Sequence, residues 1–103
     1  MTGLSWIARL QVRQAARVKA LVEANKVRTT HAARACANDL GFGLSDMLAV
    51  VMALTPADFY KSMTTHVDHT IWQDVYRPNT AAGDLYLKLT VIDDVLIVSF
   101  KEL

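Results

Sequence analysis

The C-terminal part of the chain alternates between apolar and polar side chains at the two-residue period of a β-strand. The alternation covers residues 85–92 and 95–101, and Asp93-Asp94 between them suits a tight hairpin turn. A two-residue turn here predicts four cross-strand pairs: Ile92 with Val95, Thr90 with Ile97, Lys88 with Ser99, and Tyr86 with Lys101.

This predicted ribbon has an apolar face and a polar face, because directly paired residues share a face. The apolar face, which we assign to the core, consists of Leu85, Leu87, Leu89, Val91, Leu96, Val98 and Phe100. The opposite face carries Tyr86, Lys88, Ser99 and Lys101 away from the turn, with no carboxylate paired across it. Such a patch suits a negatively charged ligand, although a solvated outer face is the ordinary alternative in an antiparallel sheet.

Two further strands are predicted at residues 59–65 and 71–76, which are rich in aromatic and β-branched side chains. A hairpin symmetric about Val67 would give two pairs: Lys61 with Gln73, and Met63 with Ile71. This hairpin would add a second cation and a neutral amide to one face of the sheet.

The N-terminal half instead predicts three helices, at residues 7–24, 31–40 and 46–54. Thr29 or Thr30 is the expected cap of the second helix, Gly41 ends it, and Ser45 caps the third. A short extended connection is expected over residues 26–30. The predicted fold class is therefore α+β: an antiparallel β-sheet, running as a four-stranded meander, with N-terminal helices packed on one face.

The composition fits one folded domain over all 103 residues, with 52% hydrophobic and 20% charged residues. No apolar run approaches the roughly 18 residues of a membrane span, and no secretory signal is visible, so we expect a cytoplasmic protein without membrane contact. Cys36 is the only cysteine, which excludes an internal disulfide. Among its alanine neighbours it is expected to be a small buried residue.

The net charge of +1 conceals an asymmetry between the two halves of the chain. Residues 1–57 carry seven basic and three acidic side chains, whereas the remainder carries four basic and seven acidic ones. Arg9, Arg13 and Arg17 recur every four residues and would form a basic stripe on the first helix. A solvated helix face and a surface for nucleic acid or an acidic partner are both compatible with this stripe.

The predicted loop 66–69 contains His66, Asp68 and His69, a combination that can bind a metal ion. Adjacent spacing supplies no third strong ligand beyond Asp68, so a polar turn is the preferred interpretation and neither a metal nor another cofactor is expected. His69 is a candidate acid or base, because the imidazole pKa suits neutral pH.

The chain contains no nucleophile elbow, phosphate-binding loop, dinucleotide fingerprint or zinc-protease motif. The predicted face of lysines, a tyrosine and a glutamine does suit RNA cleavage without a metal. That reaction needs a proton removed from the 2′-hydroxyl, charge balanced at phosphorus and a proton given to the 5′-oxygen. The alternative is a non-catalytic regulatory module that binds RNA or a protein.

Two long segments carry a specific resemblance: DFYKSMTTHVDHTIWQDVYRP, at 58–78, and LYLKLTVIDDVLIVSFKEL, at 85–103. Together with VKALVEANKVRTT they resemble the motility quorum-sensing regulator (MqsR) toxin family. The resemblance implies a RelE-like fold and a toxin that cleaves mRNA at GCU-like sites without a metal. It also implies neutralisation by a cognate antitoxin that contains zinc and a helix-turn-helix.

The residues that this family uses for catalysis correspond here to Lys61 in YKSM, Gln73 in IWQD, Tyr86 in LYLK and Lys101 in SFKE. All four are present. The neighbouring residues expected to contact the substrate are Met63, His69, Lys88 and Ser99.

Overall fold

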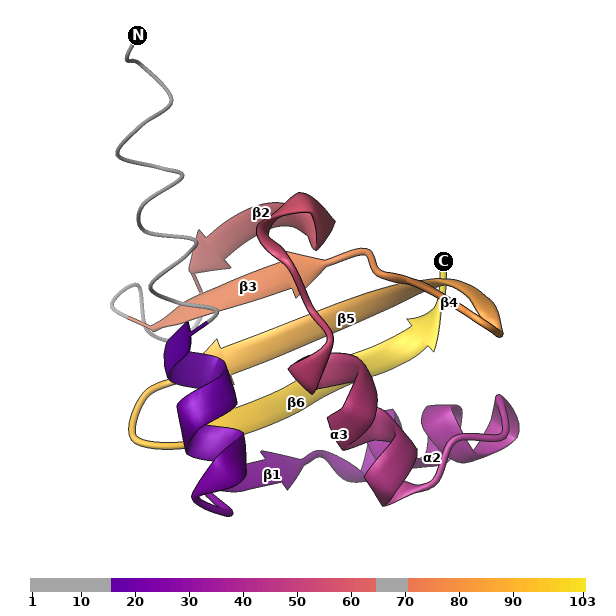
Figure 1. Ribbon diagram of the computed structural model, residues 1–103, viewed down its shortest axis with the longest axis horizontal. Coiled ribbons are helices and arrows are strands. Elements are labelled where there is room, and N and C mark those ends of the chain that lie inside the picture. The colour runs from indigo at the N-terminus through magenta and orange to yellow at the C-terminus, as the bar shows by residue number, and fades with distance from the viewer. Residues whose placement is uncertain (1–15, 65–70) are drawn as a thin grey trace, which may run out of the picture.

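A mixed β-sheet with helices on one side forms the frame of the protein in the computed structural model, which describes residues 16–64 and 71–103 (Figure 1). The strands are β1 Val27–Thr29, β2 Phe59–Thr64, β3 Trp72–Tyr76, β4 Asn79–Thr80, β5 Gly83–Val91 and β6 Val95–Glu102. Their order across the sheet is β1-β6-β5-β3-β2, and β4 pairs with β5. The predicted four-stranded antiparallel meander is therefore confirmed as β2, β3, β5 and β6.

The helices precede most of the strands, as predicted. Residues 16–23 are helical, followed by α2 His31–Asp39, α3 Leu44–Met52 and a short 3-10 helix, η1 Pro56–Asp58. Figure 1 shows the first helix, α2 and α3 on the same side of the sheet. The α+β class is therefore confirmed. The earlier part of the predicted first helix, with Arg9 and Arg13, lies outside the described residues.

Local sequence signals determine both ends of α2. The Thr30 hydroxyl accepts a hydrogen bond from the Ala33 amide at 3.1 Å, which is the predicted cap. At the other end Gly41 has a φ of +86°, and the Phe42 amide donates to the Ala37 carbonyl at 2.8 Å. This left-handed ending favours glycine because a side chain there would be strained.

The third helix begins two residues earlier than predicted. Gly43 is its N-terminal cap, and the Asp46 carboxylate accepts from the Gly43 amide at 2.9 Å. Ser45 therefore lies inside the first turn and does not cap the helix. The acidic side chain three residues after the cap was the stronger signal, because it reaches back to an unpaired amide.

The segment predicted as an extended connection is a short strand, β1, that lies at one edge of the sheet. It pairs in parallel with β6, with Val27 opposite Val95 and Thr29 opposite Ile97. The sheet is thus antiparallel except at this edge. Three residues are too few to show a strand period in the sequence, which explains why the pairing was not predicted.

The predicted register of the β5–β6 hairpin is right away from the turn and wrong beside it. Tyr86 pairs with Lys101 and Lys88 with Ser99, as expected. Near the turn the observed pairs differ from the predicted ones and are Leu89 with Ile97, Thr90 with Leu96, and Val91 with Val95. The loop has one residue more than predicted, and a β-bulge between Lys88 and Leu89 restores the register beyond it.

This correction changes the assignment of the core in β6. Val95 and Ile97 are fully buried, whereas Leu96 and Val98 are only partly buried and were wrongly assigned to the apolar face. Moving a pairing by one residue exchanges the two faces of a strand, so the extra loop residue accounts for the error.

The β2–β3 hairpin is displaced by two residues from the predicted register. Lys61 lies opposite Val75, and Met63 lies opposite Gln73. The predicted Lys61–Gln73 and Met63–Ile71 pairs are therefore wrong. A shift of two residues nevertheless preserves the faces, because side chains alternate with a period of two.

The core lies between the sheet and the helices. Phe100 packs edge-on against Phe42, with ring centroids 5.2 Å apart. Met47 and Val51 of α3 are fully buried. Cys36 is exposed, contrary to expectation, because α2 buries only Ala33 and Ala37 against the core.

No single helix in the described ranges is long and apolar enough to span a membrane; only α2 and α3 taken together reach that length, and they are bent by 96°.

A partly buried hydrogen bond holds β2 against β3 on the helix side. Asp74, 6% exposed, accepts a hydrogen bond from the Ser62 hydroxyl at 2.7 Å. Tyr76 follows on the same face of β3, and its pKa is raised by burial and by the negative charge of Asp74. The Asp74–Ser62 contact thereby fixes the strands that carry Lys61 and Gln73.

Two arginines fasten the tip of the β5–β6 hairpin. Arg28 of β1 binds the Asp94 carboxylate through Nε at 2.5 Å and Nη2 at 3.3 Å. Arg17, from the first helix, donates to the Ile92 carbonyl. Both contacts connect N-terminal elements to the C-terminal ribbon.

Replacing Phe100 with alanine should lower the free energy of unfolding by about 3–5 kcal/mol. The ring is 1% exposed and contacts Phe42, so its removal leaves a cavity. Urea denaturation followed by circular dichroism measures the loss. Ile92→Ala, at a side chain 48% exposed, is the control, and an equal loss in both variants would contradict the assignment of the core.

The Arg28–Asp94 pair should make stability depend on pH at the acidic end. The Arg28 hydrogen bond lowers the pKa of Asp94 below its ordinary value of 3.8. The stabilisation is therefore complete well above pH 3.8 and is lost as the pH falls through the lower pKa of the folded protein. Asp94→Asn and Arg28→Gln should each lower the unfolding midpoint at pH 7 and converge with the wild type as the pH falls below the lowered pKa of Asp94; a difference that is constant with pH would contradict this.

Candidate functional site

The helix-free face of the sheet carries seven of the eight predicted site residues. Side chains alternate along β2, β3, β5 and β6, so each strand contributes to this face at every second position apart from the bulges. We call the seven residues the donor face: Lys61, Met63, Gln73, Tyr86, Lys88, Ser99 and Lys101. His69 lies outside the described residues.

Cross-strand pairing arranges this face in rows. One row runs across four strands as Lys61, Val75, Lys88 and Ser99. The row nearer the β5–β6 turn consists of Met63, Gln73, Thr90 and Leu96. On the other side of the first row, Tyr86 pairs with Lys101. Because neighbouring strands lie about 4.8 Å apart, the rows bring cations from both outer strands of the meander onto one continuous surface.

Tyr86 lies beside two ammonium groups of the donor face. The Lys101 Nζ is 5.0 Å from the centroid of the Tyr86 ring, and the Lys88 Nζ is 5.9 Å from it. Cations favour the negative face of an aromatic ring at this separation. Tyr86 and Lys88 are half-buried, whereas Lys101 is exposed. The phenol and both ammonium groups are therefore available to one ligand.

Gln73 makes a hydrogen bond within the sheet face. Its Nε2 donates to the Thr90 Oγ1 at 3.3 Å. Gln73 is half-buried and Thr90 is 9% exposed. Sequence reasoning did not single out Thr90, because the predicted register placed it opposite Ile97 and a threonine in a strand is ordinary.

The centre of the donor face is electropositive. Strands β2, β5 and β6 place Lys61, Lys88 and Lys101 there, and no carboxylate belongs to the described rows that contain them. Asp84, two residues before Tyr86 on β5, accepts a hydrogen bond from the Asn79 side chain at 2.7 Å, and Asp94 is paired with Arg28. The arrangement can concentrate an anion and stabilise added negative charge.

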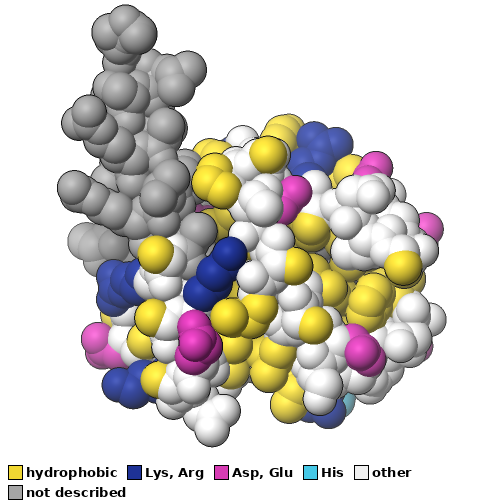
Figure 2. Space-filling model, viewed as in Figure 1, with side chains coloured by type: hydrophobic (Ala, Val, Ile, Leu, Met, Phe, Trp, Pro, Cys, Tyr) yellow, Lys and Arg dark blue, Asp and Glu magenta, His cyan; other side chains and the backbone are white. Residues whose placement is uncertain are grey.

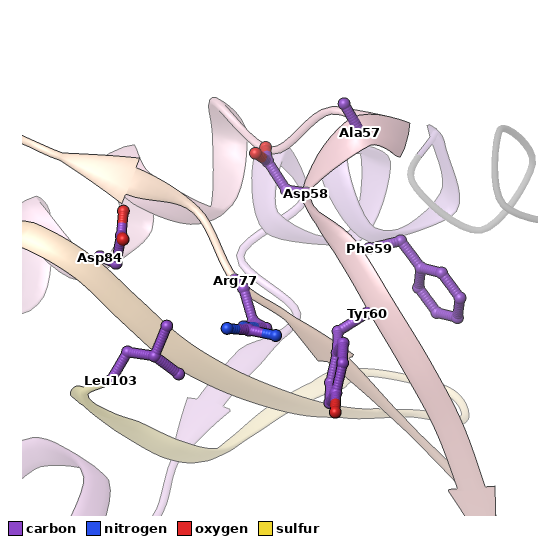
Figure 3. Close-up of a pocket in the computed structure, with 7 residues that line it drawn as sticks. All are labelled: Ala57, Asp58, Phe59, Tyr60, Arg77, Asp84 and Leu103. Atoms are coloured by element: carbon purple, nitrogen blue, oxygen red, sulfur yellow. The ribbon is translucent and has the colours of Figure 1, made fainter.

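A hollow of about 280 Å³ adjoins the end of the donor face at which Tyr86 and Lys101 lie. The Arg77 guanidinium carbon, Cζ, lies 4.7 Å from the centroid of the Tyr60 ring. In Figure 3 this guanidinium lies between the Tyr60 ring and Leu103. Sequence analysis missed Tyr60 and Arg77, because a bulge between Phe59 and Lys61 interrupts the alternation that would have placed Tyr60.

The helix side of the molecule shows hydrophobic, basic and acidic side chains at its surface (Figure 2). A hollow of about 370 Å³ there lies between α3 and the segment after β3, and its lining includes Phe42, Val50 and Pro78 with the carboxylates of Asp46 and Asp58. No lysine or arginine of the described chain lines it. Lys61, Lys88 and Lys101 lie on the other side of the sheet.

The possible metal ligands His66, Asp68 and His69 fall in the interval 65–70, outside the described residues. Within residues 16–64 and 71–103 no group of three histidine, cysteine or acidic side chains is placed to hold a metal ion. The chemical groups of the candidate site in the described residues are therefore the lysine ammonium groups, the Tyr86 phenol and the Gln73 carboxamide.

Comparison with known proteins gives a match to one family. The sequence pattern of the family described as "Motility quorum-sensing regulator, toxin of MqsA" matches residues 13–102. The chain belongs to the MqsR toxin family. It is also 60% identical over 85 residues to the mRNA interferase toxin MqsR of Escherichia coli strain K12, covering 82% of this chain and 87% of that protein.

The match to the MqsR toxin family includes all seven residues of the donor face. It also includes Thr90, Tyr60 and Arg77, which the sequence analysis did not single out. Residues 1–12 precede the matched region. The resemblance seen in the sequence therefore concerns the same segment that folds into the meander.

Proposed function

We propose that this protein is the toxin of a type II toxin–antitoxin system and that it cleaves mRNA on the donor face without a metal. One observation carries the assignment of the site. Lys61, Gln73, Tyr86 and Lys101, the four residues that correspond to the catalytic residues of the family, share the helix-free face although they come from four different strands.

The chemistry suits a shallow surface, because RNA carries its own nucleophile. The 2′-oxygen attacks phosphorus and loses its proton, the bond from phosphorus to the 5′-oxygen breaks, and that oxygen gains a proton. The products are a 2′,3′-cyclic phosphate and a 5′-hydroxyl. The protein needs to align the linkage and match charge that develops at the phosphate.

The four residues divide this work by chemical type. Lys61 and Lys101 offset the charge that builds up on the phosphate. Tyr86, placed between Lys88 and Lys101, holds the phosphate or handles a proton. Gln73 orients the substrate through its carboxamide. These roles need no metal ligand.

The remaining donor-face residues would hold the flanking RNA. Lys88 supplies positive charge, Ser99 a hydroxyl and Met63 an apolar contact, whereas His69, outside the described residues, stays a predicted substrate contact. The cleavage site is proposed to be GCU-like, as in the resembled family. The proposed neutralising partner is an MqsA-like antitoxin, with zinc and a helix-turn-helix, and the proposed location is the cytoplasm.

A non-catalytic module that binds RNA or a protein would use the same donors. Both functions give salt-dependent association with RNA. Only the nuclease gives cleaved product and arrests growth when it is expressed without a neutralising partner.

Purified protein should cut synthetic RNA that contains GCU in the presence of EDTA, leaving a 2′,3′-cyclic phosphate or 3′-phosphate. Lys101→Ala should lower the cleavage rate by about 100-fold or more, because one preorganised charge on the transition state is lost. Its thermal midpoint should stay near that of the wild type, since Lys101 is exposed.

The matched control is Lys26→Ala, which removes an exposed cation away from the donor face. Cleavage that requires a divalent metal, or equal losses of rate in both variants, would contradict the proposed site. RNA with scrambled GCU sites tests the sequence preference separately.

Binding can be separated from cleavage with an oligonucleotide that lacks the attacking 2′-hydroxyls. Lys88→Gln should reduce the slope of log binding constant against log salt concentration by about 0.7, because one phosphate contact of a single strand is lost. Fluorescence anisotropy from low to moderate salt measures both slopes. An unchanged slope for Lys88→Gln, or an equal reduction for Lys26→Gln, would remove Lys88 from the nucleic-acid surface.

A further inference from the structure

We propose that Thr90 is a positioning residue, whose hydroxyl holds the Gln73 carboxamide in its working orientation on the donor face. The inference rests on the proposed function, because it concerns the same reaction and the same glutamine. It starts from one contact, the 3.3 Å hydrogen bond from the Gln73 Nε2 to the Thr90 Oγ1.

A glutamine side chain needs such an anchor to act precisely. Its terminal torsion is broad, so a carboxamide without a fixed partner samples many orientations of its donor and acceptor ends. Donation of the Nε2 to a fixed oxygen selects one orientation before the substrate arrives. A group that is already oriented loses less entropy when the substrate binds.

Thr90 is well placed to be the fixed partner. It lies in β5, opposite Gln73 of β3 on one side and Leu96 of β6 on the other. It is 9% exposed, so water has little access to compete for its hydroxyl. Threonine is also stiff at its first torsion, because it branches at Cβ.

The same strand carries Tyr86 and Lys88, at every second position before Thr90. A single rigid strand thus sets the position of the Tyr86 phenol and, through Thr90, that of the Gln73 amide. We infer that Thr90 contributes to alignment and does not itself contact the reacting phosphate.

The test replaces Thr90 with valine, which keeps the shape and the β-branch but removes the oxygen. The turnover number should fall about three- to tenfold, the range expected for the loss of one hydrogen bond, while KM changes less than twofold. Thr90→Ser, which restores an oxygen, should recover most of the rate. Thr29→Val, the same change at a partly buried position on β1, should cleave like the wild type.

A double-mutant cycle with Gln73→Ala tests whether Thr90 affects the cleavage rate through Gln73. If Thr90 acts through Gln73, adding Thr90→Val to Gln73→Ala should cause no further loss of rate. In the RNA-free protein, the Gln73 side-chain NH₂ resonances should also shift in Thr90→Val and return in Thr90→Ser.

Each other outcome has a defined meaning. A wild-type rate in Thr90→Val, with a slow Gln73→Ala, overturns the role of Thr90 and leaves the proposed nuclease intact. Additive losses, or equal losses in Thr90→Val and Thr90→Ser, assign Thr90 to packing and also overturn it. A wild-type rate in Gln73→Ala removes Gln73 from the proposed site, and the inference fails with it.

Discussion

The two-residue alternation of side chains in β5 is the constraint on which the rest of the structure depends. This strand is paired on both sides, so its inward leucines form the middle of the core while its outward Tyr86 and Lys88 form the middle of the donor face. Packing against the helices fixes the inward set, and the alternation then fixes the outward set. The position of the candidate site is therefore a consequence of the hydrophobic core.

Much of this arrangement could be predicted, because the face on which a residue lies can be right even when its cross-strand partner is predicted wrongly. The β2–β3 register was wrong by two residues, yet Lys61 and Gln73 remained on one face. In the β5–β6 hairpin an added loop residue and a bulge compensate for each other, so the Tyr86–Lys101 pair was right although the pairs beside the turn were not. Errors of even size, or errors that cancel, leave the site intact.

The features that escaped prediction depend on tertiary contacts that have no period in the sequence. The parallel pairing of β1 involves three residues and is held by β6 and by the Arg28–Asp94 contact. Cys36 is exposed because α2 presents only two alanines to the core. Thr90 matters because it lies across from Gln73, and the position of Tyr60 depends on a β-bulge. Residue type alone reveals neither the cross-strand neighbour nor the bulge.

The two faces of the sheet have different roles: one groups the lysines, and the other stabilises the fold by burying apolar side chains. Three lysines share one surface, and none of them lies directly opposite another, so they do not by themselves favour the sheet or its register. The opposing face, with Leu85, Leu87 and Leu89 fully buried beneath the helices, supplies the stabilisation that keeps the cations together. A phosphate placed among these lysines would be attracted by all three. The core thus holds in place a set of cations that suits the charge that develops as an RNA linkage is cleaved.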